Sequence, residues 1–447
     1  MKNVTRRTVL SLSAAGAAAA FLSACGGPST SGGGSSAAPT AASLEGVKPA
    51  SEIQFWSNHP GQSSEIEKSI IAAFEKANPG IKVKLITAGK NYEEVYQKFN
   101  TAYASGNAGD VVVASDATWF KYFLNKQIIP LDDLFASQKF DVEDFRTALL
   151  EDYNYKGKHY GVPYSRSTPV FYYNKDHFKA AGLPDRAPKT WQELAEWAPK
   201  LKAASTKAQQ VFTVPDAESY NAWTLQNVIW GYGGGFSKDG DFALTKSPET
   251  KEAVSFLQKA IHGDKWAAIG SGEPADLFTS GATSTVVAST GSLKGILSAA
   301  TFNVGVGFLP GGPKETDKIV PTGGAGVAIN AKASPERQLA AAMFIKFLTN
   351  AENAAAFSKA TGYLPTRTSA DMKDAIQATP QLKIAIDQLE KTRPQDDARV
   401  FLPGGDLELA KALQGMLTAD SDPQPNLDAL STKLEGIYNK ELKPRLG

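Results

Sequence analysis

The hydrophobic pattern from residue 53 onward alternates between short apolar runs and amphipathic stretches. Residues 111–113 are a continuous apolar run, and residues 53–56 are apolar except for Gln54. Residues 81–85 alternate between apolar and polar positions, as strands do. Apolar side chains recur at helical spacing over residues 66–74 and 92–103. Strands separated by helices predict βαβ units and mainly parallel sheets.

A second block further along the chain repeats this rhythm. The pattern predicts strands over residues 170–173 and 285–288. A capping box is expected where Thr190 accepts a first-turn N–H and Glu193 bonds back to the N-cap. The Ser-Pro pair at 334–335 predicts another helix start, because a proline in the first turn loses no hydrogen bond. The chain therefore predicts an α/β protein.

The first residues of the chain have the pattern of an export signal. Lys2, Arg6 and Arg7 precede an apolar run over residues 9–22, which is shorter than the ~20 residues that a membrane-spanning helix needs. We expect a signal peptide over residues 1–24. The arginine pair partly matches a twin-arginine pattern, so both the Sec and the twin-arginine export routes stay open.

The chain has one cysteine, Cys25, and it follows Leu-Ser-Ala. This stretch resembles a bacterial lipobox, in which the cysteine becomes the lipidated N-terminus. The alternative is an ordinary signal with an incidental cysteine, which leaves the position of Cys25 unexplained. Residues 25–50 are rich in Gly, Ser, Ala and Pro, and we expect them to form a flexible linker behind the lipid anchor.

The composition excludes several classes of protein. Of the 447 residues, 42% are hydrophobic, which suffices for a sizeable core and excludes a disordered chain. The 47 basic and 46 acidic residues almost cancel, which makes a dominant nucleic-acid role improbable. Residues 1–24 carry three basic and no acidic residues, so 44 basic face 46 acidic residues in the mature chain, a net charge of −2. A single cysteine excludes an internal disulfide.

The motifs of common enzyme chemistry are missing from the sequence. None of the four histidines is paired at the i, i+4 spacing of a metalloprotease helix. The sequence has no Gly-x-Ser-x-Gly elbow and no phosphate loop ending in Gly-Lys-Ser/Thr. The glycine clusters at 231–235 and 323–326 complete no dinucleotide fingerprint and indicate turns or a close approach of backbone to a ligand. We expect no catalytic residue, metal or cofactor.

Four segments together resemble a known family. Residues 167–176, 189–194, 288–293 and 361–365 match, in order and spacing, segments of the bacterial extracellular solute-binding proteins (family 1, carbohydrate type) that serve ATP-driven importers. The chain is most similar to their sn-glycerol-3-phosphate-binding branch, from about residue 51 to the C-terminus. The resemblance implies a two-lobed periplasmic-binding-protein fold of type II, with hinge strands between the lobes and a ligand cleft at their interface.

The resemblance also implies where the chain crosses between lobes. The crossings are expected near residues 162–168, 320–324 and 360–364, where prolines and a glycine pair fix or free the backbone angles. The expected lobes are 51–165 with 322–361, and 166–321 with 362–447.

Matching the family motifs gives a set of candidate ligand contacts. Carboxylates accept hydrogen bonds from hydroxyls, serine and tyrosine hydroxyls donate and accept, and aromatic faces pack on sugar C–H surface, so these residue types suit a polyol or sugar. The candidates are Tyr92, Asp116, Ser167, Ser289, Gly324 and Tyr363, with Tyr220, Trp223 and His59 as further cleft residues. Each has a structural alternative: core for Tyr92 and Trp223, an N-cap for Asp116, turns for Ser167 and Ser289, hinge packing for Tyr363 and a solvated loop for His59.

The sequence departs from the family at one position. The glycerol-phosphate binders carry an arginine for the ligand after the last crossing, whereas residues 402–407 contain no basic residue here. Arg399 and Arg166 are the possible substitutes. A phosphate without a cation loses about 1.5–3 kcal/mol per charged hydrogen bond. Glycerol-3-phosphate, a glycerophosphodiester and a neutral sugar therefore all stay open as ligands.

We expect a monomeric substrate-binding lipoprotein on the outer face of the cytoplasmic membrane. It would capture its ligand by lobe closure and deliver it to the permease of an ABC transporter, without enzymatic activity. One alternative is a di- or oligosaccharide receptor. Alternatives of other classes are a surface adhesin and a secreted glycan hydrolase, and the hydrolase would need two carboxylates about 5–10 Å apart across a cleft.

Overall fold

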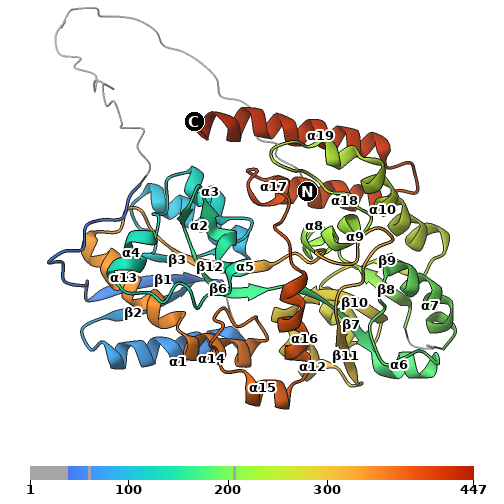
Figure 1. The fold of residues 1–447 in the computed structure, drawn as a ribbon, viewed down its shortest axis with the longest axis horizontal. Coiled ribbons are helices and arrows are strands. Elements are labelled where there is room, and N and C mark those ends of the chain that lie inside the picture. The colour runs from blue at the N-terminus through green and yellow to red at the C-terminus, as the bar shows by residue number, and fades with distance from the viewer. Residues whose placement is uncertain (1–38, 59–61, 205–207, 447) are drawn as a thin grey trace, which may run out of the picture. The chain divides into compact units, whose positions relative to one another are not determined.

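Two five-stranded sheets organise residues 39–58, 62–204 and 208–446, the part of the chain that this computed structural model describes (Figure 1). The first sheet has the strand order β2-β1-β3-β12-β6 and the second the order β11-β7-β10-β8-β9. Helices alternate with these strands along the chain. The predicted α/β class is therefore confirmed.

Helices α1 and α13 cover one face of the first sheet. Phe55 of β1 and Phe74 of α1 both pack on Phe344 of α13, with ring centroids 5.5 and 5.3 Å apart. The strands are β1 (Glu52–Ser57), β2 (Lys82–Thr87), β3 (Val111–Ser115), β6 (Val162–Ser167) and β12 (Gly323–Ile329). The helices around them are α1 (Gln62–Ala77), α2 (Tyr92–Ala104), α3 (Trp119–Leu124), α13 (Pro335–Leu348) and α14 (Ala351–Thr361).

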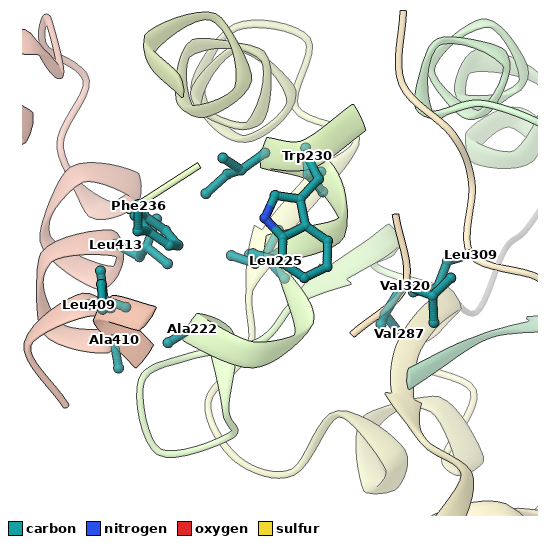
Figure 2. Packing of buried hydrophobic residues seen from close by; sticks show 14 of the residues in the cluster. Ala222, Leu225, Trp230, Phe236, Val287, Leu309, Val320, Leu409, Ala410 and Leu413 are labelled. Atoms are coloured by element: carbon teal, nitrogen blue, oxygen red, sulfur yellow. The ribbon is translucent and has the colours of Figure 1, made fainter. Parts of the chain in front are cut away.

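A helical layer packs beside the second sheet. In Figure 2, Trp230 and Phe236 lie in the apolar core toward which α18 presents Leu409 and Leu413. The strands are β7 (Pro169–Asn174), β8 (Gln210–Val214), β9 (Ala267–Ile269), β10 (Thr283–Ser289) and β11 (Val304–Gly307). The helices that matter below are α7 (Trp191–Ala204), α8 (Asn221–Thr224), α9 (Gln226–Gly231), α17 (Asp397–Val400) and α18 (Gly405–Thr418).

The expectation of mainly parallel sheets is wrong. β1 pairs in parallel with β2 and β3, and β8 with β9 and β10. The other four pairings within these two sheets are antiparallel, and they involve β12 in the first sheet and β7 in the second. Apolar periodicity reports which faces of a strand are buried and carries no information on its direction. Both sheets are therefore mixed.

The predicted helix starts are found, with one change in bonding. Ser334 caps α13 by accepting the Arg337 N–H at 3.4 Å, and Thr190 accepts the Glu193 N–H at 3.1 Å. The Glu193 carboxylate, however, bonds the Lys189 N–H and the Arg186 guanidinium. The reciprocal half of the predicted capping box is therefore wrong, because a nearby cation draws the carboxylate one residue further out.

The segment before β1 is held against the first sheet. The Ala42 N–H donates to Gln338 Oε1 and the Ala50 N–H to the Glu336 carbonyl, both at 2.9 Å. Residues 39–50 of the predicted linker therefore lie along α13, because their small apolar side chains fill the edge of the core. The predicted signal peptide and Cys25 lie outside the described residues. No helix within the described ranges has the length and apolar character to cross a bilayer.

Three chain crossings lie together between the sheets. β6 ends in the first sheet and β7 begins in the second, with Thr168 between them. Thr168 Oγ1 donates to the Pro321 carbonyl at 3.2 Å, just before β12. The Leu364 N–H donates to the Arg166 carbonyl at 2.8 Å, which ties the segment after α14 to the first crossing. The residue-level boundaries of the two lobes stay a prediction.

Gly324 is required at the second crossing. Its φ of +83° favours glycine, and a Cβ there would lie 2.1 Å from the Ser165 carbonyl oxygen. We expect Gly324→Ala to lower the free energy of unfolding by about 2 kcal/mol or more, through backbone strain plus the clash. Urea unfolding followed by circular dichroism measures this. Gly281, with a φ of +79° and open space around its Cα, provides the control. An equal loss in Gly281→Ala would contradict the role of the clash.

Candidate functional site

A cavity of about 870 Å³ lies where the crossings meet the ends of β3 and β10 and the start of α2. Nine of the predicted site residues line it: Tyr92, Asp116, Ser167, Tyr220, Trp223, Ser289, Gly324, Tyr363 and Arg399. Arg166 does not line it, and His59 lies outside the described residues. The structure thus brings together residues up to 307 positions apart in sequence, as the distance from Tyr92 to Arg399 shows. Ligand contact by these residues stays a prediction.

Strand ends and helix starts position the polar side chains. Asp116 directly follows β3, and its N–H donates to the Gly324 carbonyl at 3.0 Å. The N-cap alternative for Asp116 does not hold, because Thr118 occupies the N-cap position of α3. Tyr92 is the first residue of α2, whose N-cap Asn91 accepts the Glu94 N–H at 2.9 Å. Both side chains are therefore held at the rim of the first sheet.

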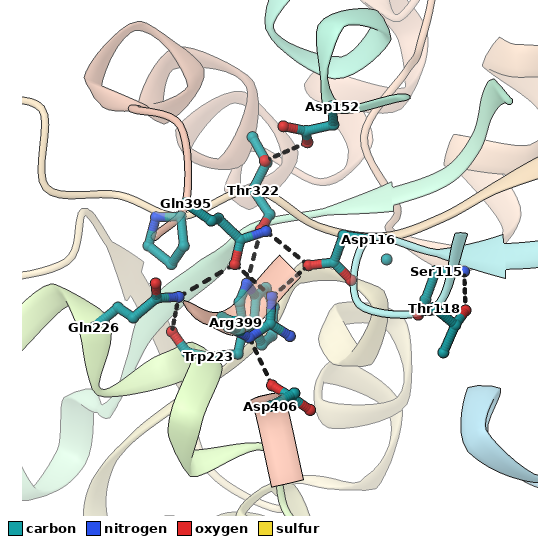
Figure 3. A network of polar contacts seen from close by, with 12 residues as sticks. Ser115, Asp116, Thr118, Asp152, Trp223, Gln226, Thr322, Gln395, Arg399 and Asp406 are labelled. Carbon is teal, nitrogen blue, oxygen red and sulfur yellow. Dashed lines mark hydrogen bonds and ion pairs between the residues drawn. The ribbon is translucent and has the colours of Figure 1, made fainter. Parts of the chain in front are cut away.

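Arg399 of α17 joins two carboxylates at the cavity (Figure 3). Its Nη1 lies 2.6 Å from Asp116 Oδ2, and its Nε lies 2.7 Å from Asp406 Oδ1. Gln395 Nε2 donates to the same Asp116 oxygen at 2.7 Å. The side chains of Arg399 and Asp116 are only 4% and 6% exposed, so this is a buried ion pair with a third, half-exposed partner. Two carboxylates around one guanidinium give the group a net charge of −1.

Burial and charge act against each other in this group. Burial lowers the pKa of Arg399, but the Asp116 and Asp406 carboxylates outweigh it and raise that pKa above its usual value. Burial raises the pKa of Asp406, and the Arg399 charge partly offsets that rise. The guanidinium thus keeps its charge when buried. It can bind an anionic ligand if Asp116 or Asp406 moves away from it.

The segment that carries Arg399 belongs to the core beside the second sheet. Asp396 accepts the Phe236 N–H at 2.6 Å and the Trp230 Nε1–H at 3.2 Å. The Ala398 N–H donates to Ser237 Oγ at 2.8 Å. Since Asp116 extends from the first sheet, the bond between Asp116 and Arg399 spans the gap between the two sheets.

Arg166 has a structural place instead of a place at the cavity. Strand alternation turns it away from Ser167, and it is fully buried behind the crossing. There it pairs with Asp152, and its Nη1 donates to the Tyr153 hydroxyl at 2.9 Å. Thr322 Oγ1 donates to the same Asp152 carboxylate at 2.5 Å. We therefore do not retain Arg166 among the proposed ligand contacts.

Two tyrosines, Tyr92 and Tyr363, form one side of the cavity, and we call them the tyrosine wall. Their hydroxyls hydrogen-bond each other. Burial raises the pKa of Tyr363 above its usual value and the pKa of Tyr92 well above it. The Tyr363 ring lies over Gly291, where a Cβ would approach the ring to 2.7 Å. The wall is therefore neutral at physiological pH and fixed by close packing.

The other predicted residues line the cavity, and two of them, Trp223 and Ser289, also make contacts that stabilise the fold. Trp223 is 6% exposed, and its Nε1–H donates to the Thr322 carbonyl at 2.9 Å, so much of its ring is core. Tyr220 is 42% exposed at the cavity mouth and has a left-handed φ of 61°. Ser289 Oγ accepts the Gly291 N–H at 3.0 Å, which is the turn role left open above.

Sequence reasoning missed several cavity residues. Asp406 was not singled out, although it lies in the first turn of a helix that follows two glycines. The other polar lining residues that were missed are Asn58, Lys90, Asn91, Glu93, Glu94, Gln97, Ser115, Thr118, Lys121, Glu218, Ser292 and Lys411. Surface-like Lys and Glu residues give no sequence signal of a site. Within the described ranges, no group of three or more His, Cys, Asp or Glu side chains is arranged to hold a metal ion.

Comparison with known proteins places the chain in a family. The profile of the bacterial extracellular solute-binding protein family matches residues 69–384. The chain belongs to this family. The sn-glycerol-3-phosphate-binding periplasmic protein UgpB of Salmonella typhimurium is 32% identical over 338 residues, which cover 71% of this chain and 75% of that protein. UgpB of Escherichia coli K12 is 31% identical over 345 residues, which cover 74% and 77%.

Solved structures of solute-binding proteins agree with this family and its fold. UgpB from Mycobacterium tuberculosis, in complex with glycerophosphocholine, is 42% identical with a TM-score of 0.83, covering 88% of this chain and 99% of that one. The maltose-bound MalE3 of T. maritima is 21% identical with a TM-score of 0.75, covering 86% and 99%. The expected two-lobed periplasmic-binding-protein fold and the resemblance to the glycerol-3-phosphate-binding branch are thus confirmed.

Removing Arg399 should be costly, and the cost should depend on pH. Arg399→Met leaves Asp116 and Asp406 without their cation, and we expect the free energy of unfolding at pH 7 to fall by about 3 kcal/mol. Since the buried carboxylates then bind protons more readily, the deficit relative to wild type should shrink toward pH 5. Urea unfolding at both pH values measures it. Arg393, which pairs with Asp396 but is 38% exposed, gives the control Arg393→Met. A deficit independent of pH would contradict the charge argument.

Proposed function

We propose that this protein is the substrate-binding component of an ABC importer and that it captures glycerophosphodiesters. The observation that carries the proposal is the Asp116–Arg399–Asp406 group at a cavity between the two sheets. A guanidinium binds a phosphate oxygen pair, and a carboxylate accepts hydrogen bonds from glycerol hydroxyls. The relative that is 42% identical was crystallised with glycerophosphocholine.

The charge of the group favours a diester over a monoester. A phosphate monoester carries about −1.5 to −2 charges at pH 7. Adding it to a buried group of net charge −1 creates repulsion that a single guanidinium does not offset. A choline or ethanolamine diester is zwitterionic, so its phosphate can approach Arg399 without adding net charge. Its cationic end suits the acidic and aromatic lining residues Glu93, Glu94, Glu218 and Tyr220.

Ligand capture would work by a shift between open and closed lobes. Asp116 and Arg399 extend from opposite sides of the gap, so one ligand that bonds both stabilises the closed arrangement. In this structure, the two side chains bind each other across the gap. The ligand thus replaces an existing bond between the two sides, which limits its net gain and allows release to a permease.

The glycan hydrolase alternative is weaker than the receptor. Asp116 does have a second carboxylate near it, Asp406, but both bind the same guanidinium. A glycan hydrolase needs two carboxylates that face each other across the bound sugar, whereas these two are both bonded to one guanidinium. The oligosaccharide receptor has support only from relatives near 20% identity, such as the maltose-bound protein. We infer a binding protein that leaves its ligand chemically unchanged.

We propose the following position in the cell. Residues 1–24 direct export, and Cys25 carries the lipid that anchors the chain to the outer face of the cytoplasmic membrane. The membership in an extracellular solute-binding family supports export. The residues from 26 up to the first described residues then separate the anchor from the folded part, and the protein acts as a monomer that docks on a membrane permease.

Calorimetric titration at pH 7 tests the ligand. Glycerophosphocholine should bind at least about tenfold more tightly than glycerol-3-phosphate, because only the monoester adds net charge to the cavity. Asp116→Ala should weaken glycerophosphocholine binding by at least about 1 kcal/mol, whereas Asp116→Asn, which keeps a hydrogen-bonding group, should lose less. Mass spectrometry of the recovered ligand should find it intact. Binding of maltose without glycerophosphocholine binding, or a hydrolysed ligand, would contradict the proposal.

Lipidation at Cys25 has its own test. Wild type expressed in a bacterium with lipoprotein processing should fractionate with membranes and carry a diacylglycerol-modified N-terminal peptide by mass spectrometry. Cys25→Ala should abolish the modification. The protein should then move from the membrane pellet to the supernatant, and its ligand affinity should be unchanged. Membrane association that persists unchanged in Cys25→Ala would rule out this anchor.

A further inference from the structure

A buried carboxyl group, Glu67, lies behind the tyrosine wall and has no part in the ligand contacts proposed above. Glu67 is on α1 and is 1% exposed. Its Oε1 accepts hydrogen bonds from Ser57 Oγ at 2.6 Å and from the Tyr164 hydroxyl at 3.0 Å. Its Oε2 is buried and has no hydrogen-bond partner among the described residues. A solvent-excluded carboxylate oxygen without a donor is costly, which calls for an explanation.

Glu67 joins α1 to two strands that lead to the cavity. Ser57 ends β1 and precedes Asn58, which lines the cavity. Tyr164 lies on β6 beside Ser165, which hydrogen-bonds the Tyr92 hydroxyl. Removing the Glu67 carboxyl would therefore release β1, α1 and β6 from one another just below the lining residues.

An aromatic stack connects Glu67 to the other half of the wall. The Tyr164 ring lies 4.7 Å from that of Phe357 on α14, and the Phe357 ring lies 5.7 Å from that of Tyr363. The Glu67 charge is also close enough to raise the pKa of Tyr363. Glu67 thus acts on Tyr363 through its charge, and it is linked to both wall tyrosines through Tyr164 and its neighbours.

We propose that Glu67 is a positioning residue for the tyrosine wall, that it acts in its protonated form, and that binding of a phosphate-bearing ligand is therefore coupled to proton uptake at Glu67. The proposal rests on the proposed function for its ligand. When the ligand enters, it displaces water from the cavity in front of the wall. The loss of this water disfavours the carboxylate relative to the neutral acid.

The surroundings of Glu67 agree with a neutral acid. Burial raises its pKa to about 7, although the hydrogen bonds from Ser57 and Tyr164 lower it. Among the described residues, the titratable groups that face it are Tyr164 from β6 and Tyr363 from the third crossing, and Tyr92 of α2 lies beyond them. α13 and α14 pack on α1 through apolar side chains, and within the described ranges none of their charged residues forms an ion pair with Glu67. Within the part of the chain that the structure describes, no cation forms an ion pair with this carboxylate.

The sign of the coupling follows from linkage. A ligand that raises the pKa of Glu67 binds more tightly at low pH, and its affinity falls as pH rises through the pKa values of the free and bound forms. Glycerophosphocholine is the suitable probe, because a phosphodiester has no ionisation near pH 7, whereas a monoester titrates near pH 6. Any pH dependence in this range then belongs to the protein.

Calorimetry at pH 6 and pH 8 gives the first test. Wild type should bind glycerophosphocholine about fivefold more weakly at pH 8 than at pH 6, and heats in buffers of different ionisation enthalpy should report proton uptake at pH 7. Glu67→Gln keeps the shape without the titration and should bind equally at both pH values, within about twofold of wild type at pH 6. Glu75→Gln, on the same helix but bonded to Lys82 and Val83, should retain the wild-type pH dependence.

Hydrogen exchange of the ligand-free protein gives a second test that needs no ligand. After correction for the intrinsic effect of pH, peptides covering 160–168 and 358–366 should lose protection from pH 6 to pH 8 in wild type but not in Glu67→Gln. Equal pH dependence of exchange in the two proteins would overturn the positioning role even if no ligand binds. The expected exchange with a pH-independent affinity would overturn the coupling to the ligand, and absent binding at both pH values would count against the proposed function alone.

Discussion

The ion pair between Asp116 and Arg399 is the interaction on which the cavity depends. A buried guanidinium is tolerable only where carboxylates and amides satisfy it, and here they come from opposite sides of the gap between the sheets. The pair therefore links the position of the two halves to the charge state of the site. Asp116 is held by β3, and Arg399 by the segment that Asp396 and Ala398 bond to the core beside the second sheet. A ligand that changes this ion pair therefore also changes the contact between the two halves.

The crossings supply the rigid base for this motion. Thr168, Pro321 and Leu364 belong to different crossings, yet hydrogen bonds join them into one layer. The close backbone approach at Gly324 and the ring packing on Gly291 leave no space for adjustment there. A hinge built in this way can rotate as a unit while it keeps the spacing of the tyrosine wall, and it places the flexible part of the mechanism in side chains.

The sequence predicts local features well and long-range pairing poorly. The strands around 53–56, 111–113 and 170–173 were expected because apolar runs and alternation are local signals. Strand direction was missed, since an antiparallel partner such as β12 comes from more than 100 residues away. The site followed the same rule. Asp116 was expected from its match to the family motifs. Asp406 has no such signal, and it becomes informative only once the fold places it beside Arg399. Arg166 lies in the core and its neighbour Ser167 lines the cavity, because successive residues of a strand point to opposite faces.

The two sides of the cavity differ in how they handle charge, and this difference defines the ligand they suit. On one side, a guanidinium is balanced by two carboxylates, so a phosphate is accepted only in exchange for an existing partner. On the other side, neutral tyrosines lie in front of a buried carboxyl group that becomes unfavourable when ionised. A dianion is repelled by the carboxylates on the first side and by an ionised Glu67 on the second. A neutral sugar brings no charge that could replace the present partners of the guanidinium. A phosphodiester with a cationic group satisfies the first side and adds the least charge to the second.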